Sequence, residues 1–187
     1  IMKDRFKVSN PRAMSVLIYD NSQASSFTAQ QPMNNVIRGT VTGLVQALSG
    51  IQVMSIATFD EAHAIPSPEA ARTALRTQQI LAFETGVPNT IAPLAGSYYV
   101  ESLTRSMIRR AWQHIQEVEA LGGMAKAIET GLPKMRIEES AARRQANIDA
   151  GTEKIIGVNT YTLDHEEAMD TLEVDNSAVR QSQVERL

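Results

Sequence analysis

Two acidic residues stand side by side at the end of an apolar run. Asp60 and Glu61 follow residues 51–57, whose length and composition predict a buried strand. Neighbouring carboxylates at the end of a strand can bind a metal, act as an acid and a base, or accept hydrogen bonds from ligand hydroxyls. One of them can equally cap the turn while the other is solvated, and spacing alone favours this structural interpretation.

A second polar loop comes earlier in the chain. Residues 20–31 are rich in serine and glutamine, and Gln23, Gln30 and Gln31 carry neutral amides that can hold a polar ligand. By themselves these glutamines are more typical of an ordinary loop. The residues that follow, 28–38, lead directly into an amphipathic stretch, so the loop stands between a strand and a helix.

Other catalytic and metal-binding motifs are missing from the sequence. His63, His114 and His165 lack the mutual spacing of metal ligands, so we expect no zinc site and no other bound metal. His63 follows the acidic loop and can face the same site, although a surface position is the more common one. The Gly122-Gly123 pair is typical of a helix stop, not of a phosphate-binding loop.

The segments around the two loops predict a β-α-β-α unit. Residues 14–19 are a short apolar run that predicts the first strand, and an apolar stripe predicts a helix over 34–48. After the second strand, Ser67 as N-cap and Pro68 at the first helical position predict a helix that ends near Thr85. Strands joined by a helical crossover pair in parallel, so both polar loops are expected at the same edge of the sheet.

Helical patterns dominate the rest of the chain. We expect a long helix from Ser97 to the Gly122-Gly123 pair, a short helix over 124–129 and another over 135–150. A short extended segment over 154–159 and a helical C-terminal end follow. The predicted domains are therefore an α/β part over 1–92 and a mainly helical region over 93–187.

Composition limits the possible partners. The 187 residues carry a net charge of −3, with a pI near 5.7, so we expect no broad basic surface of the kind that binds nucleic acid. There is no cysteine, no apolar run approaches the ~20 residues that span a bilayer, and no signal peptide is visible. We therefore expect no membrane partner and a cytoplasmic location. The first residue is Ile1, not Met, so we expect a piece of a longer polypeptide.

Two βα units cannot form a barrel of eight strands by themselves, and their edge strands would be exposed. The fold class expected from the residues is thus a partial TIM (β/α)8 barrel. It would comprise the last two βα units, followed by a mainly helical extension, with a polar site after the strands.

Many stretches, in unbroken order, resemble one enzyme family. The chain is similar to the large, catalytic subunit of methylmalonyl-CoA mutase and its relatives, the adenosylcobalamin-dependent acyl-CoA mutases. The matching stretches are Thr28–Arg38, Phe59–Ala62, Ala74–Gln79, Pro93–Tyr98, Glu117–Ile128, Pro133–Glu139, Ala141–Ala146, Ile156–Asn159 and Val174–Ser177.

The resemblance implies an isomerase, of the intramolecular transferase type, acting on a CoA thioester. In this family the acyl-CoA threads along the axis of a TIM barrel, and a separate domain presents cobalamin at the barrel mouth. A radical from adenosylcobalamin then starts a carbon-skeleton rearrangement. Residues 1–92 would be the end of the barrel and residues 93–187 the linker to the cobalamin domain. The segment alone is expected to be inactive, and family members form homo- or hetero-oligomers.

The resemblance also suggests cofactor-binding residues. Glu61 matches the family's glutamate on the adenosylcobalamin side of the site, and Ala64 matches a neighbouring backbone contact. Gln23 is the best candidate for a glutamine of the preceding loop that faces cofactor and substrate. No catalytic residue can be assigned, because the cobalamin-binding histidine motif and the first barrel strands are absent from this sequence.

Two departures from the family's pattern leave open a different acyl-CoA substrate or lost activity. Ile18-Tyr19-Asp20 stands where the family has Arg-aromatic-His, and residues 53–57 replace Ser-Leu-His-Thr-Asn. Several polar side chains that face the ligand are therefore replaced by apolar or small ones. Methylmalonyl-CoA is the default substrate, with isobutyryl-CoA or a hydroxyacyl-CoA still open. The alternatives are a non-catalytic interaction module that binds a mutase subunit or chaperone, and a truncated homologue with no role of its own.

Overall fold

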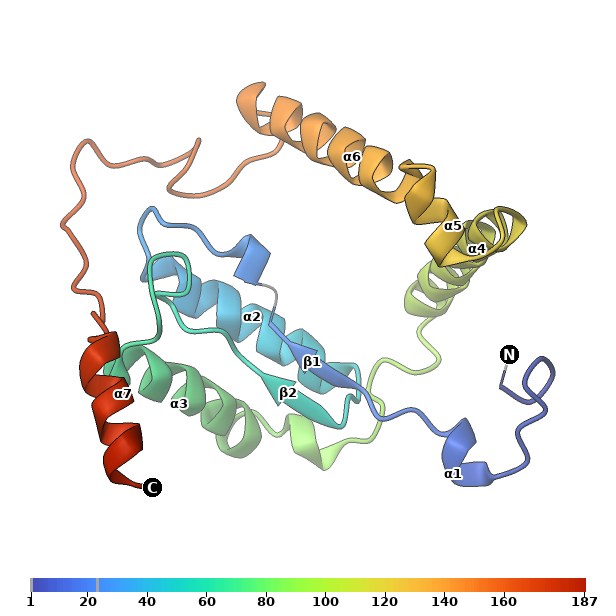
Figure 1. Cartoon of the computed structure of the whole chain (residues 1–187), viewed down its shortest axis with the longest axis horizontal. Coiled ribbons are helices and arrows are strands. Elements are labelled where there is room, and N and C mark those ends of the chain that lie inside the picture. Colours follow the sequence, from blue (N-terminus) through green and yellow to red (C-terminus); the bar gives the residue numbers. More distant parts are fainter. Residues whose placement is uncertain (1, 23) are drawn as a thin grey trace. The chain divides into compact units, whose positions relative to one another are not determined.

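The computed structural model describes residues 2–22 and 24–187, and the chain divides into two compact units. The first unit comprises Ile1–Pro93 together with Glu166–Leu187, and the second comprises Leu94–His165. The elements of the first unit, labelled in Figure 1, are α1 (Pro11–Met14), β1 (Tyr19–Asn21), the 3-10 turn η1 (Ala24–Ser26), α2 (Asn34–Leu48), β2 (Val53–Ser55), α3 (Pro68–Glu84), the 3-10 turn η2 (Val87–Asn89) and α7 (Asn176–Glu185).

The sheet of the first unit has two parallel strands. β1 and β2 pair in the register Tyr19↔Val53, Asp20↔Met54 and Asn21↔Ser55, and their arrows point the same way in Figure 1. Helix α2 connects them as the crossover that parallel pairing requires. The predicted α/β class and the β-α-β-α order are therefore confirmed.

The first strand begins later than the sequence predicts. Met14 ends the short helix α1, and the strand covers only Tyr19–Asn21 instead of 14–19. The ladder begins where a partner is present, because the carbonyl of Ile18 accepts the N–H groups of Gln52 and Val53, both at 3.2 Å. An apolar run predicts where a strand is buried, whereas pairing also needs a neighbouring strand.

Both long helices of this unit follow their sequence signals. The Ser67 hydroxyl accepts the N–H of Ala70, and Pro68 is the first residue of α3, as predicted from the Ser-Pro-Glu sequence. Helix α2 has the predicted bounds 34–48. A glycine, Gly86, follows α3 with a φ of 69°, in the left-handed region that ends many helices.

The small core of the first unit lies between β2, α2 and α3. Ile56, Ala74 and Leu81 form its buried cluster, and Leu44 and Met54 pack against it. Two glycines of α2 allow the close approach: a Cβ atom at Gly39 or Gly43 would lie 2.9 or 2.7 Å from side-chain carbons of Ile56. These glycines, which weaken a helix in isolation, are therefore needed for packing.

The second unit is helical, and its helices lie close to the ranges predicted for them. Its helices are α4 (Tyr98–Ala120), α5 (Met124–Glu129) and α6 (Leu132–Asp149). Ser97 caps α4, and Gly131, with a φ of 76°, precedes α6, which begins three residues before the predicted start at 135. Pro133 does not break the helix because it lies in the first turn, where proline needs no intrahelical N–H bond.

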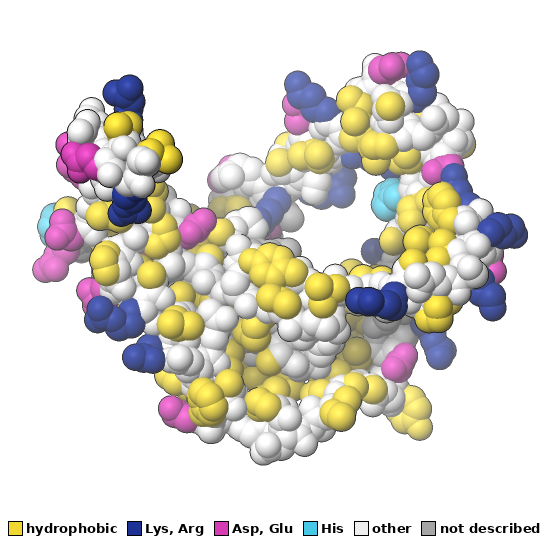
Figure 2. All heavy atoms as spheres, turned by 60° about the horizontal axis from the view of Figure 1, so that its bottom comes forward, with side chains coloured by type: hydrophobic (Ala, Val, Ile, Leu, Met, Phe, Trp, Pro, Cys, Tyr) yellow, Lys and Arg dark blue, Asp and Glu magenta, His cyan; other side chains and the backbone are white. Residues whose placement is uncertain are grey.

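Apolar side chains are widely exposed on both units, and they form patches on the face drawn in Figure 2. In the first unit, Val16 and Leu17 are 75% and 74% exposed, and Ile37 and Val41 of α2 are 64% and 58% exposed. Helix α4 contains no buried residue along its whole length. Among the described residues, no helix is long and apolar enough to cross a membrane.

Candidate functional site

The carboxyl ends of the two strands are clamped together by Ser22. Its N–H donates to the carbonyl of Ser55 at 2.9 Å, and its hydroxyl accepts the N–H of Ala57 at 2.6 Å. Ser22 is only 2% exposed. The loop after β1 and the loop after β2 therefore begin side by side, as the parallel arrangement predicts.

Asn35, in the first turn of α2, holds the two loops in place. It is 1% exposed, and its amide donates to the carbonyls of Thr28 and Phe59, both at 2.9 Å. Its side-chain oxygen accepts the N–H of Thr28 at 3.1 Å and a guanidinium N–H of Arg38 at 2.7 Å. Arg38 also donates to the Thr28 hydroxyl at 2.8 Å. All hydrogen-bonding capacity of this buried amide is used to join the loops to the helix.

A histidine adds a second link between the loops. The Nε2 atom of His63, in the loop after β2, lies 2.9 Å from the carbonyl oxygen of Ala29, in the loop after β1. A hydrogen bond to this carbonyl requires the proton on Nε2, so the contact selects that tautomer. His63 is itself exposed, at the surface of the loop pair.

The two neighbouring acids have different environments. Asp60 is 2% exposed and its Oδ2 atom accepts the N–H of Ser67 at 2.8 Å, immediately before α3. Glu61 is exposed at the surface of the same turn. Asp60 is thus the structural member of the pair, and Glu61 is the carboxylate that can reach a ligand.

Hydrogen bonding decides the charge state of Asp60. Burial acts to raise the pKa of its carboxyl, but the N–H of Ser67, the hydroxyls of Thr58 and Ser67 and its own backbone N–H together bring that pKa below the ordinary value. The group is therefore ionised at neutral pH.

The three predicted cofactor residues are located as follows. Glu61 and Ala64 lie in one turn after β2, with Glu61 exposed and Ala64 partly buried. The N–H of Ala64 donates to the carbonyl of Asp60 at 3.2 Å, so a backbone contact from Ala64 to a ligand would use its carbonyl oxygen. Gln23 lies outside the described residues. The structure brings Glu61 and Ala64 together, and their role remains a prediction.

A polar network covers the sheet face that α2 leaves open. Side chains alternate along a strand, so Tyr19, Asn21 and Ser55 lie on the same face of the sheet. Asp20 points to the opposite face, which α2 covers, and there Gln46 donates to its Oδ2 at 3.0 Å. The Tyr19 and Ser55 hydroxyls lie 2.9 Å apart, and Ser55 donates to the Asn21 side-chain oxygen at 2.7 Å. These three side chains form a hydrogen-bonded row on this face.

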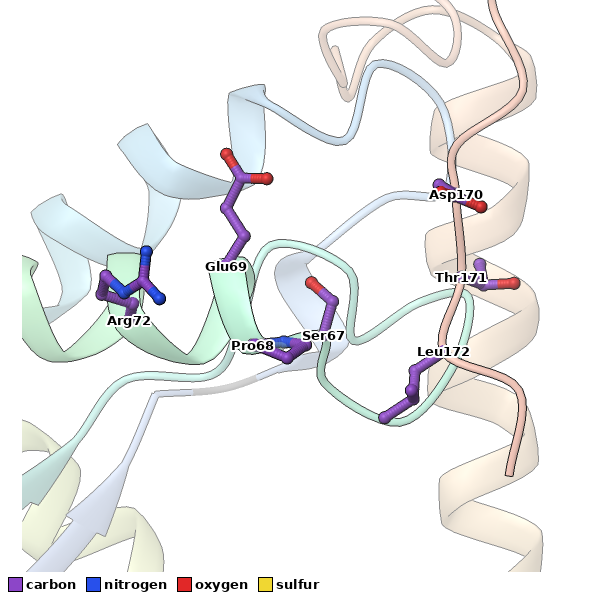
Figure 3. Close-up of a pocket in the computed structure, with 7 residues that line it drawn as sticks. All are labelled: Ser67, Pro68, Glu69, Arg72, Asp170, Thr171 and Leu172. Carbon is purple, nitrogen blue, oxygen red and sulfur yellow. The ribbon is translucent and has the colours of Figure 1, made fainter. Parts of the chain in front are cut away.

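A pocket lies at the start of α3, between it and the C-terminal segment. It encloses about 510 Å³ and is lined by Ser67–Glu69, Arg72 and residues 170–172. Figure 3 shows Glu69 and Arg72 on the same side of α3, with Leu172 on the facing segment. Among the described residues, no cluster of three or more acidic or histidine side chains could hold a metal.

Comparison with known proteins identifies the family. A family profile described as methylmalonyl-CoA mutase matches residues 1–187, the whole chain. This chain belongs to the methylmalonyl-CoA mutase family. The resemblance found in the sequence is therefore confirmed.

Individual members of the mutase family are similar along nearly all of this chain. It is 48% identical to methylmalonyl-CoA mutase of Rhizobium meliloti over 178 residues, which are 94% of this chain and 25% of the relative. It is 47% identical over 183 residues to the large subunit of Propionibacterium freudenreichii subsp. shermanii, covering 98% of this chain and 25% of that protein. The mitochondrial mutase of Bos taurus is 45% identical over 184 residues, 97% of this chain and 24% of its own length. The chain thus spans about a quarter of the mutases that it matches.

Sequence reasoning missed the residues that hold the two loops together. Asn35 and Ser22 were not singled out, although Asn35 lies within a stretch that carries the family resemblance. A signal did exist: an asparagine in the first turn of an amphipathic helix, following a loop of polar residues, is well suited to bond loop backbone. Ser22 has no comparable signal, because its partner Ala57 is 35 residues away in the sequence.

Proposed function

We propose that this chain supplies the last two βα units of a TIM-barrel acyl-CoA mutase, with residues 93–187 as the linker to a cobalamin-binding domain. The main support for this proposal is the parallel pair β1–β2, because the carboxyl ends of the two strands and the polar loops after them meet at one edge of the sheet. That edge is where catalytic groups collect in TIM barrels. The α/β class is established, and the complete barrel belongs to the proposal.

Unpartnered groups beside β1 support a preceding βα unit. The Oε1 atom of Gln46 is buried without a hydrogen-bond partner among the described residues, and Gln46 lines an open groove of about 300 Å³ next to Asp20. Val45, 55% exposed, lines the same groove. An adjacent strand and helix would supply both the missing donor and the apolar cover.

The proposed reaction is the isomerisation of a CoA thioester, by rearrangement of its carbon skeleton, with methylmalonyl-CoA as the default substrate. Adenosylcobalamin, when bound, supplies the carbon radical that starts such a rearrangement. The other three quarters of the mutase length would supply the cobalamin domain and most substrate contacts. The chain would therefore act within a larger polypeptide or oligomer and be inactive alone.

The loop after β2 fits a role on the cofactor side. Glu61 presents an exposed carboxylate beside a turn that Asn35 and Asp60 hold in place, so it can accept hydrogen bonds from ligand hydroxyls without rearranging the loop. Ala64 offers its carbonyl in the same turn, and Gln23 is proposed for the preceding loop from the resemblance alone. In the barrel, Tyr19 and Ser55 would lie on the inward face of the sheet, next to the substrate.

The test measures adenosylcobalamin-dependent isomerisation of methylmalonyl-CoA by the complete native polypeptide. Glu61→Ala is expected to weaken cofactor binding or slow turnover about ten- to a hundredfold, as for the loss of a hydrogen bond to a charged group. Glu84→Ala, at the exposed end of α3, is the matched control and should leave both unchanged.

Three outcomes decide between the candidate functions. Unchanged kinetics in Glu61→Ala would remove Glu61 from the site while leaving the mutase assignment intact. A native polypeptide that isomerises none of the tested acyl-CoA substrates would refute the assignment itself. A polypeptide that binds a mutase subunit or its chaperone, but neither acyl-CoA nor corrin, would favour the interaction module instead.

A further inference from the structure

The C-terminal segment of the first unit returns to the loops at the carboxyl ends of the strands. The Oε2 atom of Glu166 accepts the backbone N–H of Gln31 at 2.7 Å, although the two residues are 135 positions apart. A few residues later, Asp170, Thr171 and Leu172 line the pocket of Figure 3 together with the start of α3. The segment thus meets the structure after β1 and after β2.

The backbone of residues 28–31 is held almost entirely by side chains. The N–H and carbonyl of Thr28 bond to Asn35, and the carbonyl of Ala29 bonds to His63. The carbonyl of Gln30 accepts the Thr28 hydroxyl at 2.8 Å. All these partners come from the two loops and from α2, so they form as soon as this part of the chain folds.

Gln31 differs in both conformation and partner. Its φ of 48° lies in the left-handed region, which costs a residue with a β-carbon about 1–2 kcal/mol. Its carbonyl accepts the N–H of Asn34, and its side-chain oxygen accepts the amide of the same residue, both at 2.9 Å. Its N–H has the carboxylate of Glu166, a distant residue, as its partner. A charged acceptor at 2.7 Å is a strong one, and it favours this backbone conformation.

We propose that Glu166 is a positioning residue for the loop over residues 28–31. It holds Gln31 in the left-handed conformation, and this fixes the direction in which the exposed side chain of Gln30 leaves the loop. The inference rests on the proposed function, because it takes this loop to be a wall of the mutase site. The loop reaches its working geometry only when the C-terminal segment around Glu166 has docked.

Hydrogen exchange in the complete native polypeptide, resolved at the Gln31 amide, tests the contact directly. Glu166→Ala should accelerate exchange of this amide about ten- to a hundredfold. Glu166→Gln keeps a carbonyl acceptor and should retain most of the protection. Glu167→Ala is the control, since it removes a neighbouring exposed acid from the same segment. Unchanged exchange in Glu166→Ala, or equal acceleration in Glu167→Ala, would overturn the proposal.

Steady-state kinetics test whether the loop matters for turnover. In Glu166→Ala we expect kcat to fall about tenfold and the KM for acyl-CoA to change by no more than about twofold. A displaced loop over residues 28–31 disturbs the geometry of the reacting atoms, whereas a long substrate keeps most of its binding contacts elsewhere. Glu166→Gln should recover most of kcat. If Glu166→Ala loses the exchange protection of the Gln31 amide but keeps the kcat of the parent, the contact exists and has no positioning role in turnover. If the parent has no mutase activity, the proposed function fails, and exchange alone still decides whether Glu166 holds the loop.

Discussion

Replacing Gly43 by alanine measures how closely α2 packs on β2. A Cβ atom at this position would lie 2.7 Å from the Cδ1 atom of Ile56 and 3.0 Å from the Cδ1 atom of Leu81. Both side chains belong to the buried cluster, so neither can move far. Overpacking of this kind costs about 1–3 kcal/mol. Alanine in place of glycine recovers about 1 kcal/mol of helix propensity, so the net loss is about 0–2 kcal/mol.

The coupling with Ile56 gives a sharper test than the single change. Ile56→Val removes the Cδ1 atom, which costs about 0.5–1.5 kcal/mol in the parent protein because it leaves a cavity. In Gly43→Ala this atom makes the closer of the two short contacts, so its removal should cost nothing or stabilise the protein. We expect a coupling energy of about 1–2 kcal/mol between the two positions.

Gly39 provides the matched control for this cycle. A Cβ atom there would lie 2.9 Å from the Cγ2 atom of Ile56, which valine retains. Ile56→Val should therefore not rescue Gly39→Ala, and that coupling should stay below about 0.5 kcal/mol. Native-state hydrogen exchange of the α2 amides reports the local opening free energy and is suited to a polypeptide of any length. The packing argument would be refuted if Gly43→Ala and Ile56→Val had additive effects, or if Ile56→Val rescued Gly39→Ala as well as it rescues Gly43→Ala.

Further predictions concern three polar groups. Asn35→Asp replaces an amide that donates to two backbone carbonyls by a carboxylate that repels them. The opening free energy of α2, measured by hydrogen exchange of its amides, should therefore fall by about 2–4 kcal/mol. Asp60 has a lowered pKa, so its stabilisation is complete above the ordinary carboxyl pKa near ~4 and is lost as the pH falls through the lower folded value. Asp60→Asn, which keeps an acceptor for Ser67, should flatten this acid dependence in the same measurement. On the second unit, the hydrogen bond from Arg136 lowers the pKa of Glu117, so Arg136→Ala should raise it in an NMR titration without changing the melting temperature measurably.

The helices of this chain were predictable because their signals are local. The caps Ser67 and Ser97 each bond an N–H three residues further along the chain, and apolar stripes set the bounds of α2. The bounds of the first strand were not predictable in the same way. A strand is defined by a partner far along the sequence, and the run over 14–19 meets its partner only at its end.

In the candidate site, too, local features were predictable from the sequence and long-range contacts were not. Neighbouring acids after a strand predicted a turn with one capping and one solvated residue, and Asp60 and Glu61 are arranged in this way. Residue types could not tell which acid is buried, because the answer depends on the start of α3 and on the N–H of Ser67. The clamp by Ser22 and the contact of Glu166 join residues far apart in the sequence, and no pattern within one segment predicts such contacts.

Most polar side chains at this edge of the sheet hold the loops in place. Ser22, Asn35 and Asp60 are each at most 2% exposed and bond to backbone, so they are not free to meet a ligand. Under the proposed function, the side chains available for recognition are those that extend beyond this framework, and Glu61 and Gln30 are exposed examples. Changes at the buried residues should therefore affect stability and activity together, whereas a change at Glu61 should affect the ligand alone. That separation makes Glu61→Ala, with the opening free energy of α2 measured alongside, the most direct test of whether this loop belongs to the mutase site.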